Sequence, residues 1–276
     1  MKLIRGIHNL SQAPHGCVLT IGNFDGVHRG HQALLQRLRA EGRQRGLPVV
    51  VMIFEPQPLE LFAADKAPAR LTRLREKLNY LAESGVDYVL CVRFDRRFAA
   101  LTAQDFISEL LVRQLGVQFL AVGDDFRFGA GRQGDFLLLQ KAGVEFGFDV
   151  TSTQPSVKAA CASAARRYVR RWRTTICPSR RRCWGHPFTI SGRVVHGDEL
   201  GRTIGFPTAN LPLRRQVSPG KRGLCGRSDR AWRQTFYGGR QHWYSSNGLR
   251  RASAAGSSSP GCCNGPLRSP YRCNTA

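Results

Sequence analysis

Short apolar runs alternate with segments of helical periodicity over the first 158 residues, and this alternation constrains the fold more than any other feature of the chain. Strands that alternate with helices form a parallel sheet with right-handed crossovers. Continuous apolar runs, such as residues 49–54, are typical of strands that are covered on both faces. We therefore predict an α/β fold with a parallel sheet. The strands are expected at residues 17–21, 49–54, 86–92, 117–122 and 148–151, and the helices at 30–45, 71–84, 102–115 and 134–146.

The ten residues after the first predicted strand carry a phosphate-handling pattern, Gly22-Asn-Phe-Asp-Gly-Val-His-Arg-Gly-His31. Its glycines let the backbone approach a ligand, and the helix that follows offers unpaired N–H groups to phosphate. His28 and His31 share one face of the first helical turn, where both imidazoles can donate to phosphate oxygens. A zinc site would need further ligands, and none is evident in the sequence nearby. Two surface histidines at a helix start remain the plain alternative.

Three further segments follow in order: Phe54-Glu-Pro-Gln-Pro58, Leu71-Thr-Arg-Leu-Arg-Glu-Lys77 and Val122-Gly-Asp-Asp-Phe-Arg-Phe-Gly129. With the HxGH pattern they resemble the HxGH nucleotidylyltransferase superfamily. More narrowly, they resemble the N-terminal module of the prokaryotic bifunctional riboflavin kinase/FMN adenylyltransferase (FAD synthetase) family. The resemblance implies a Rossmann-like sheet, ATP, FMN and riboflavin as substrates, and FAD biosynthesis as the function. A different HxGH nucleotidylyltransferase, of nicotinamide-nucleotide or pantetheine-phosphate type, is the alternative, and FAD formation would discriminate the two.

The resemblance also assigns roles to single residues. It makes His28 and His31 the catalytic residues that hold the ATP phosphates, and it places Phe54 and Phe128 at the flavin. Core packing is the alternative for both phenylalanines. Asn23 and Asp25 would lie at the nucleotide and metal. The implied nucleotide-binding residues are Gly22, Asn23, Phe24, Asp25, Gly30, Asp125 and Arg127.

Charge and composition change abruptly after residue 158. The chain has a formal net charge of +23, but residues 1–158 hold 20 basic and 16 acidic residues, a net of only +4. Residues 159–276 hold 22 basic and 3 acidic residues, a net of +19, together with seven of the nine cysteines. A basic, tryptophan-containing tail that binds nucleic acid is one interpretation, and salt-dependent DNA binding lost on truncation at residue 158 would support it.

A second motif stands inside this altered region. The segment from Gly185 to Asn210 resembles the start of the riboflavin kinase domain, a small antiparallel barrel. The resemblance implies that Thr208 and Asn210 hold Mg²⁺, an ion that prefers oxygen ligands. Resemblance is lost again after about residue 219, where Asp229 is the one acidic residue. We therefore expect a fragment of the kinase barrel followed by a disordered tail, without kinase activity.

The loss, return and second loss of resemblance suggest shifts of reading frame. The family pattern Val-Arg-Ile-Ser-Ser-Thr, which completes the ATP site together with a following Arg, is absent where it is expected after Lys158. The codons of residues 160–166, read from the third base, permit these six residues in order. The codons of residues 241–248, read from the second base, permit Asn-Ile-Gly-Thr-Arg-Pro-Thr, which resembles a kinase-family segment. We interpret residues of about 160–184 and 220–276 as out-of-frame translation, so that adenylyl transfer is impaired.

The motifs and the changes in composition divide the chain into four regions. We expect an FMN adenylyltransferase domain at 1–158, an aberrant segment at 159–184, a kinase fragment at 185–218 and an aberrant tail at 219–276. No run of about 18 apolar residues is present, so we expect no membrane span. The first 17 residues lack the apolar region of a signal peptide, which favours the cytoplasm. The expected partners are small molecules rather than nucleic acid.

Overall fold

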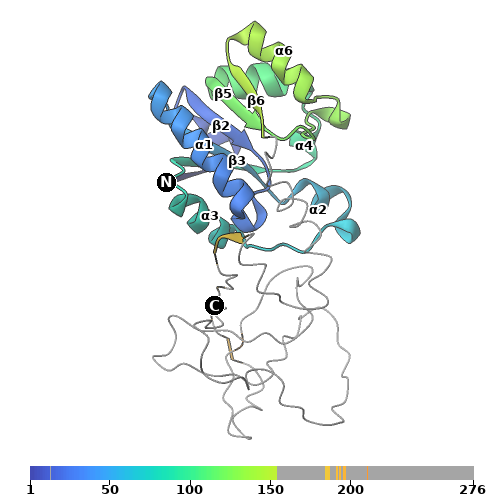
Figure 1. Cartoon of the computed structure of the whole chain (residues 1–276). Coiled ribbons are helices and arrows are strands. Elements are labelled where there is room, and N and C mark those ends of the chain that lie inside the picture. The colour runs from blue at the N-terminus through green and yellow to red at the C-terminus, as the bar shows by residue number, and fades with distance from the viewer. Residues whose placement is uncertain are drawn as a thin grey trace, which may run out of the picture. The chain divides into compact units, whose positions relative to one another are not determined.

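The structure, a computed structural model, describes residues 1–12, 14–153, 184–186, 191, 193, 195–196 and 210. The chain divides into two compact units, Met1–Arg170 with Cys177–Gly185, and Arg171–Ile176 with His186–Ala276. Unit 1 contains a sheet of six strands in the order β1-β4-β3-β2-β5-β6, and every adjacent pair is parallel (Figure 1). The strands are β1 Lys2–Arg5, β2 Cys17–Ile21, β3 Val49–Glu55, β4 Tyr88–Arg93, β5 Val117–Val122 and β6 Asp149–Ser152.

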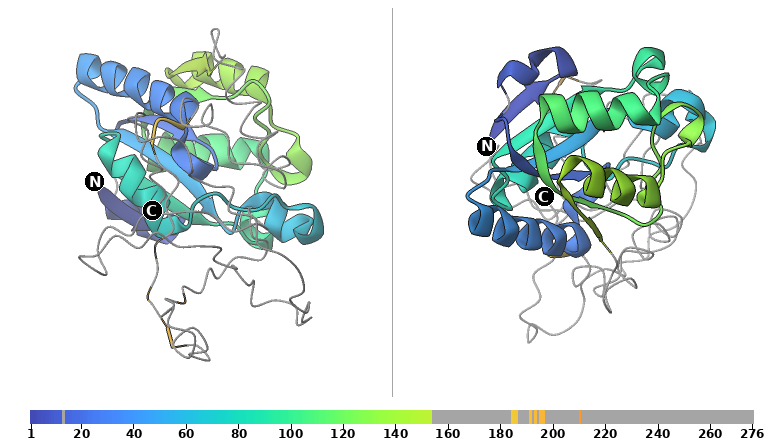
Figure 2. Two further views of the ribbon diagram at one scale, coloured as in Figure 1. Left: turned by 60° about the horizontal axis from the view of Figure 1, so that its bottom comes forward. Right: turned by 90° about the horizontal axis from the view of Figure 1, so that it is seen from above.

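Helices cover both faces of this sheet (Figures 1 and 2). One hydrophobic cluster joins one face of the sheet to α1 (Arg29–Arg45) and α3 (Leu74–Glu83). The other cluster joins the opposite face to η4 (Phe106–Gln114) and α6 (Phe136–Phe146). Such double cover explains why the central strands are continuously apolar. The remaining helices are η1 Ile7–Gln12, η2 Asp25–Val27, α2 Pro58–Phe62, η3 Ala64–Lys66, α4 Arg96–Ala99, α5 Ala103–Asp105 and η5 Ala130–Arg132.

The strand order reverses direction at β2, and this reversal positions the site. From β2 the chain moves outward through β3 and β4, and it then crosses to β5 on the other side of β2. In open parallel sheets a ligand crevice forms at the carboxyl ends of the strands where the order reverses. The HxGH segment follows β2, and the segment 123–129 follows β5. The topology therefore brings two of the sequence motifs to one edge of the sheet.

The predicted α/β class and parallel sheet are confirmed for unit 1, with three differences in its elements. The edge strand β1 was not predicted, because its four residues contain only two aliphatic side chains. The short helices α2 and α4 were also not predicted. The helix expected at 102–115 is correct in place, but it is built from α5 and then from η4, which has π-helical hydrogen bonding.

Few residues of unit 2 belong to the described part of the chain. Val195 and Asn210 form an antiparallel bridge, in which the Val195 N–H donates to the Asn210 carbonyl at 2.9 Å. Thr208, the remaining kinase barrel and the tail lie outside the described residues. No helix in the described ranges is long and apolar enough to cross a lipid bilayer.

Candidate nucleotide site at the carboxyl end of β2

The backbone between β2 and α1 is a strained turn. Phe24 and Val27 have φ angles of 46° and 33°, which residues other than glycine rarely adopt, and Gly26 has a φ of 74°. A Cβ at Gly26 would lie 3.2 Å from the Leu71 side chain, so both conformation and space favour glycine there. Strain of this kind costs about 1–3 kcal/mol per residue, and it persists only where surrounding contacts fix the backbone. It is concentrated here in the predicted phosphate loop.

His28 begins helix α1. Its Nδ1 accepts hydrogen bonds from the N–H groups of Gly30 and His31, at 3.2 and 3.4 Å, so the imidazole is the N-cap. A Cβ at residue 30 would lie 3.0 Å from the His28 ring, which explains the glycine of the HxGH pattern. Because Nδ1 is an acceptor, the neutral ring carries its proton on Nε2. Nε2–H is therefore the donor side of the ring, and it belongs to a residue at a helix N-terminus, a place that attracts phosphate.

His31 stacks on His28, with ring centroids 3.8 Å apart and an interplanar angle of 19°. Phe24 also contacts the His31 ring, at a centroid distance of 4.7 Å and a tilted angle of 38°. Burial lowers the pKa of His31 well below its usual value, and the nearby His28 and Lys77 lower it further. His31 is therefore neutral at neutral pH. Its Nδ1 is buried and has no hydrogen-bond partner among the described residues.

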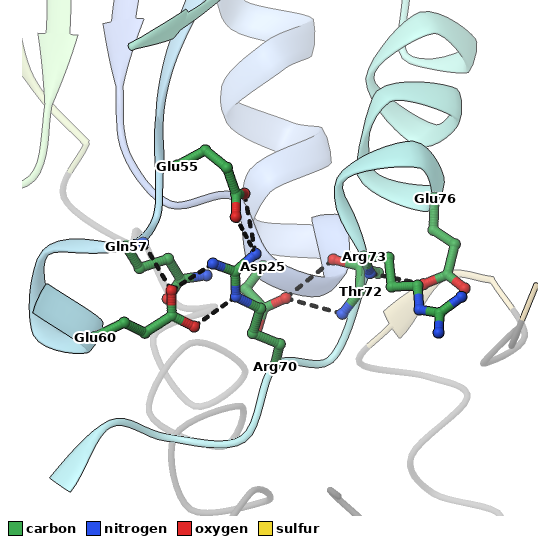
Figure 3. A network of polar contacts seen from close by, with 8 residues as sticks. All are labelled: Asp25, Glu55, Gln57, Glu60, Arg70, Thr72, Arg73 and Glu76. Atoms are coloured by element: carbon green, nitrogen blue, oxygen red, sulfur yellow. Dashed lines mark hydrogen bonds and ion pairs between the residues drawn. The ribbon is translucent and has the colours of Figure 1, made fainter. Parts of the chain in front are cut away.

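The predicted ligand Asp25 points toward the segment before α3. Its Oδ2 accepts from the Leu71 N–H at 2.8 Å, and its Oδ1 accepts from the Thr72 N–H and hydroxyl, both at 2.9 Å. Figure 3 shows the carboxylate turned to this segment. Thr72 also accepts from the Gly26 N–H at 3.0 Å. Asp25 thus has contacts within the protein, while its role toward the nucleotide stays a prediction.

Arg70 ties the same segment to the end of β3. Its guanidinium contacts Glu55 at 2.7 Å and forms a second ion pair with Glu60 (Figure 3). Glu60 Oε2 also accepts from the Gln57 N–H at 2.8 Å. The Arg70 hydrogen bond is the main reason that the pKa of Glu60 is lowered, and Glu60 in turn raises the pKa of Arg70. No spacing pattern in the sequence indicates this network, because its members come from three separate segments.

Lys77 is a residue of the quoted Leu71–Lys77 motif to which the sequence assigned no role. Its side chain is fully buried in α3, and Nζ has no hydrogen-bond partner within the described part of the chain. Burial lowers its pKa, and the carboxylates of Asp25 and Glu55 oppose the shift. A buried, unpartnered ammonium group is energetically costly. Its position beside the site makes it an electrostatic neighbour of His31.

Replacing Lys77 by Met should stabilise the protein at pH 7 by about 1–3 kcal/mol, because it removes a buried ammonium while Asp25 and Glu55 keep other partners. A lysine whose pKa is lowered on folding holds fewer protons when folded, so stability rises with pH between its folded and unfolded pKa values. The advantage of Lys77→Met should therefore shrink toward pH 10, as measured by urea unfolding. Burial raises the pKa of Cys17 to about 12, an effect that both proteins share. Lys141→Met, at an exposed helical position, is the control, and its stability relative to the unmodified chain should not change with pH. A stability gain of Lys77→Met that stays constant up to pH 10 would contradict a lowered pKa of Lys77.

The loop after β5 holds the other predicted residues. Asp125 is exposed, and Arg127 Nη1 pairs with Asp135 Oδ2 at 2.9 Å. Asp135 caps α6 through the Leu138 N–H, which lowers the pKa of Asp135, with a smaller contribution from Arg127. Phe128 is 6% exposed and lies 5.0 Å from the Phe106 ring. Its backbone N–H and carbonyl both pair with Gly134.

Phe54 and Phe128 both belong to the core cluster that also contains η4, and a chain of aromatic contacts connects them. Phe54 contacts Phe98, Phe98 contacts Phe106, and Phe106 contacts Phe128. Phe54 is 8% exposed. The core role that the sequence allowed for both residues is therefore present, and their contact with flavin stays a prediction.

Two observations bear on the metal. The described residues contain no group of three or more His, Cys, Asp or Glu side chains able to hold an ion. The Asp25 carboxylate accepts three hydrogen bonds, and Asn210 of unit 2 is exposed. The donor set that is described does not form a protein cage for Mg²⁺, an ion that often binds instead through substrate phosphates and water.

Trp184 lies against the strained turn within unit 1. Its ring approaches the Cβ position of Gly26 to 3.7 Å, and its carbonyl accepts from Gln32 Nε2 at 3.0 Å. Gln32 Nε2 also donates to the Val27 carbonyl at 2.9 Å. The sequence predicted Trp184 as part of an aberrant segment and gave no signal for this contact.

A doubly covered parallel sheet with stacked HxGH histidines at the β2–α1 junction defines an α/β protein of the nucleotidylyltransferase class. The FAD synthetase family model matches residues 10–163, and the riboflavin kinase family model matches residues 184–246. The chain belongs to the bifunctional riboflavin kinase/FMN adenylyltransferase family. The second match runs past residue 218, where the expected kinase fragment ends.

Curated relatives give the same family. The chain is 75% identical over 225 residues to the bifunctional riboflavin kinase/FMN adenylyltransferase of Escherichia coli (strain K12), covering 80% of this chain and 71% of the relative. It is 48% identical over 223 residues to the protein of that name from Haemophilus influenzae, covering 79% and 71%. A crystal structure described as a macrolide-efflux protein from Streptococcus pneumoniae matches with a TM-score of 0.63 and 27% identity, covering 80% of this chain and 72% of that one. The family carries out two activities of FAD biosynthesis, with ATP, riboflavin and FMN as substrates.

Proposed function

We propose that unit 1 binds ATP at the carboxyl ends of β2 and β5 and transfers its adenylyl group to FMN, at a reduced rate. The observation that carries this proposal is the stacked pair of His28 and His31 at the start of α1. The pair sits next to the reversal of strand order, where ligands of such sheets bind. Membership of the family indicates the reaction, and the site contains the groups that we propose perform it.

The proposed chemistry is one displacement at phosphorus. A phosphate oxygen of FMN attacks the α-phosphorus of ATP, the bond from that phosphorus to the oxygen bridging it to the β-phosphorus breaks, and pyrophosphate leaves with the electron pair. His28 donates its Nε2–H to an oxygen of the transferring group, and neutral His31 supports it on the same helical face. The positive end of the α1 helix dipole adds to this field. Catalysis then consists of positioning and charge stabilisation.

The other predicted residues complete the proposal. Gly22, Asn23, Phe24 and Gly30 shape the loop around the phosphates, and Asp25 holds it. Asp125 and Arg127 lie toward the adenylate and flavin, on the loop after β5. Phe54 and Phe128 form the apolar wall on the flavin side. Mg²⁺ is proposed to bind to unit 1 together with ATP. In the kinase fragment, it is proposed to be held by Thr208 and Asn210.

The same proposal includes the loss of one activity and the impairment of the other. Residues 1–158 form the adenylyltransferase domain, whereas 159–184 and 219–276 are out-of-frame segments around the kinase fragment 185–218. The Ser-Ser-Thr…Arg element, whose hydroxyls and guanidinium would hold ATP, is missing after Lys158. Asp229 is the one acidic residue between residue 218 and residue 276, and it lies within the range that the riboflavin kinase model matches. We propose that Asp229 does not supply the acidic base that the kinase reaction needs.

A single assay tests this proposal. The full chain is incubated with MgATP and FMN, or with MgATP and riboflavin, and flavins are separated by chromatography. We expect FAD from FMN at a rate about 100-fold or more below that of the Escherichia coli relative, and no FMN from riboflavin. The reduced rate follows from lost phosphate donors, each of which contributes about 100-fold in comparable sites. FMN formed from riboflavin would refute the kinase part, and the lack of both FAD formation and ATP binding would refute the adenylyltransferase part.

A further inference from the structure

The strained turn before α1 is hydrogen-bonded to a segment nearly fifty residues later in the chain. Asp25 uses both carboxylate oxygens, which accept from the Leu71 N–H at 2.8 Å and from the Thr72 N–H and hydroxyl at 2.9 Å. Backbone N–H donors fix the direction of a carboxylate, because they cannot move independently of the chain. The turn and the segment are therefore held in one relative position (Figure 3).

The Thr72 hydroxyl makes this connection in both directions. It donates to Asp25 Oδ1 at 2.9 Å and accepts from the Gly26 N–H at 3.0 Å. Thr72 is 2% exposed, so little water competes for these bonds. A single hydroxyl thus bridges two consecutive residues of the turn, the first by its side chain and the second by its backbone.

The far end of the segment is anchored separately. Arg70, next to Leu71, forms ion pairs with Glu55 and Glu60 at the end of β3 and in α2. After Thr72, the Arg73 N–H donates to Glu76 Oε2 at 2.7 Å and begins α3. The segment that holds the turn is consequently fixed to the sheet on one side and to a core helix on the other.

We propose that Thr72 and Asp25 are positioning residues that hold the strained turn, and with it His28 and His31, in the conformation that receives the phosphates of ATP. This inference rests on the proposed function, since it concerns the same site. Val27 is the last residue of the turn and directly precedes His28, so a relaxed turn displaces the imidazole that caps α1. Neither residue needs to touch the nucleotide for this role.

The test compares three threonine variants of the full chain. Thr72→Val keeps the branched shape and removes the hydroxyl, and Thr72→Ser restores the hydroxyl. Thr20→Val is the matched control, because Thr20 is a 1% exposed β2 residue whose hydroxyl has no partner among the described residues. MgATP affinity is measured by calorimetry. Amide hydrogen exchange is measured for residues 22–31, with β5 as the internal reference.

We expect Thr72→Val to weaken MgATP binding at least tenfold and to accelerate exchange in residues 22–31 without changing exchange in β5. The MgATP affinity of Thr72→Ser should stay within about threefold of that of the unmodified chain. Thr20→Val should leave both the affinity and the exchange rates unchanged. If Thr72→Val does not fold, Asp25→Asn takes its place, because its amide sets an N–H₂ donor against the donors of residues 71 and 72.

Two outcomes would overturn the assignment. Unchanged exchange and ATP affinity in folded Thr72→Val would show that the hydroxyl does not position the turn. Failure of Thr72→Ser to restore both would point to packing instead. If the unmodified chain does not bind MgATP, the proposed function fails, whereas the exchange comparison without nucleotide still decides whether Thr72 holds the turn.

Discussion

Restoring the missing phosphate-binding element should raise FAD formation by this chain about 100-fold or more. The codons of residues 160–168 are read from the third base, and the encoded peptide replaces these nine residues. The reading permits Val-Arg-Ile-Ser-Ser-Thr, and the triplet that joins the Tyr168 and Val169 codons permits Arg at the third place after Thr. Hydroxyl and guanidinium donors would then face the ATP phosphates beside His28 and His31. Each donor of this kind typically contributes about 100-fold or more to a rate.

A control distinguishes the effect of the restored hydroxyl groups from the effect of replacing the nine residues. A second replacement carries Ala at the two Ser positions and the Thr, so that backbone length and the remaining residues are the same. We expect this protein to stay close to the unmodified chain in its rate of FAD formation, measured with saturating FMN and MgATP. Equal rates for the two replacements, or an unmodified chain as fast as the Escherichia coli relative, would contradict the out-of-frame interpretation.

The sequence predicted the sheet well because its strands are buried on both faces. Continuous apolar runs such as β3 have few other interpretations, and the helices between them carry their own periodicity. β1 was not predicted because a four-residue edge strand is too short to show a hydrophobic period. The π-helical hydrogen bonding of η4 has no known pattern of residues, so a plain helix was the natural expectation.

The site was predictable where the residues are consecutive, and it was not predictable where they are distant. His28 and His31 follow from spacing along one helical turn. The contacts of Asp25 with residues 71 and 72 join segments that only the tertiary fold brings together. His28 was expected to serve the phosphates, but its second task, capping α1 through Nδ1, requires knowledge of the ring orientation. Lys77 stood in a quoted motif, and only its burial identifies it as an unusual lysine.

The N-cap role of His28, together with its proposed phosphate role, predicts a second large effect. In the restored chain, His28→Asn should lower FAD formation about 100-fold or more, because it removes the Nε2–H donor. Asn is among the best N-cap residues, so its side-chain oxygen can still accept from the N–H groups of residues 30 and 31. Helix α1 should therefore remain intact in this variant. Steady-state rates and urea unfolding measure the two properties separately.

His28→Ala is the matched comparison, since it removes the donor and the cap together. We expect the same loss of rate and, in addition, a loss of about 1 kcal/mol in the free energy of unfolding. Equal stability of the Asn and Ala variants would show that the Nδ1 contacts do not cap α1. A His28→Asn variant with full activity would show that the imidazole does not serve the transferring phosphate. Phosphate chemistry and helix capping would then belong to different residues, and His31 would be the remaining candidate for the first.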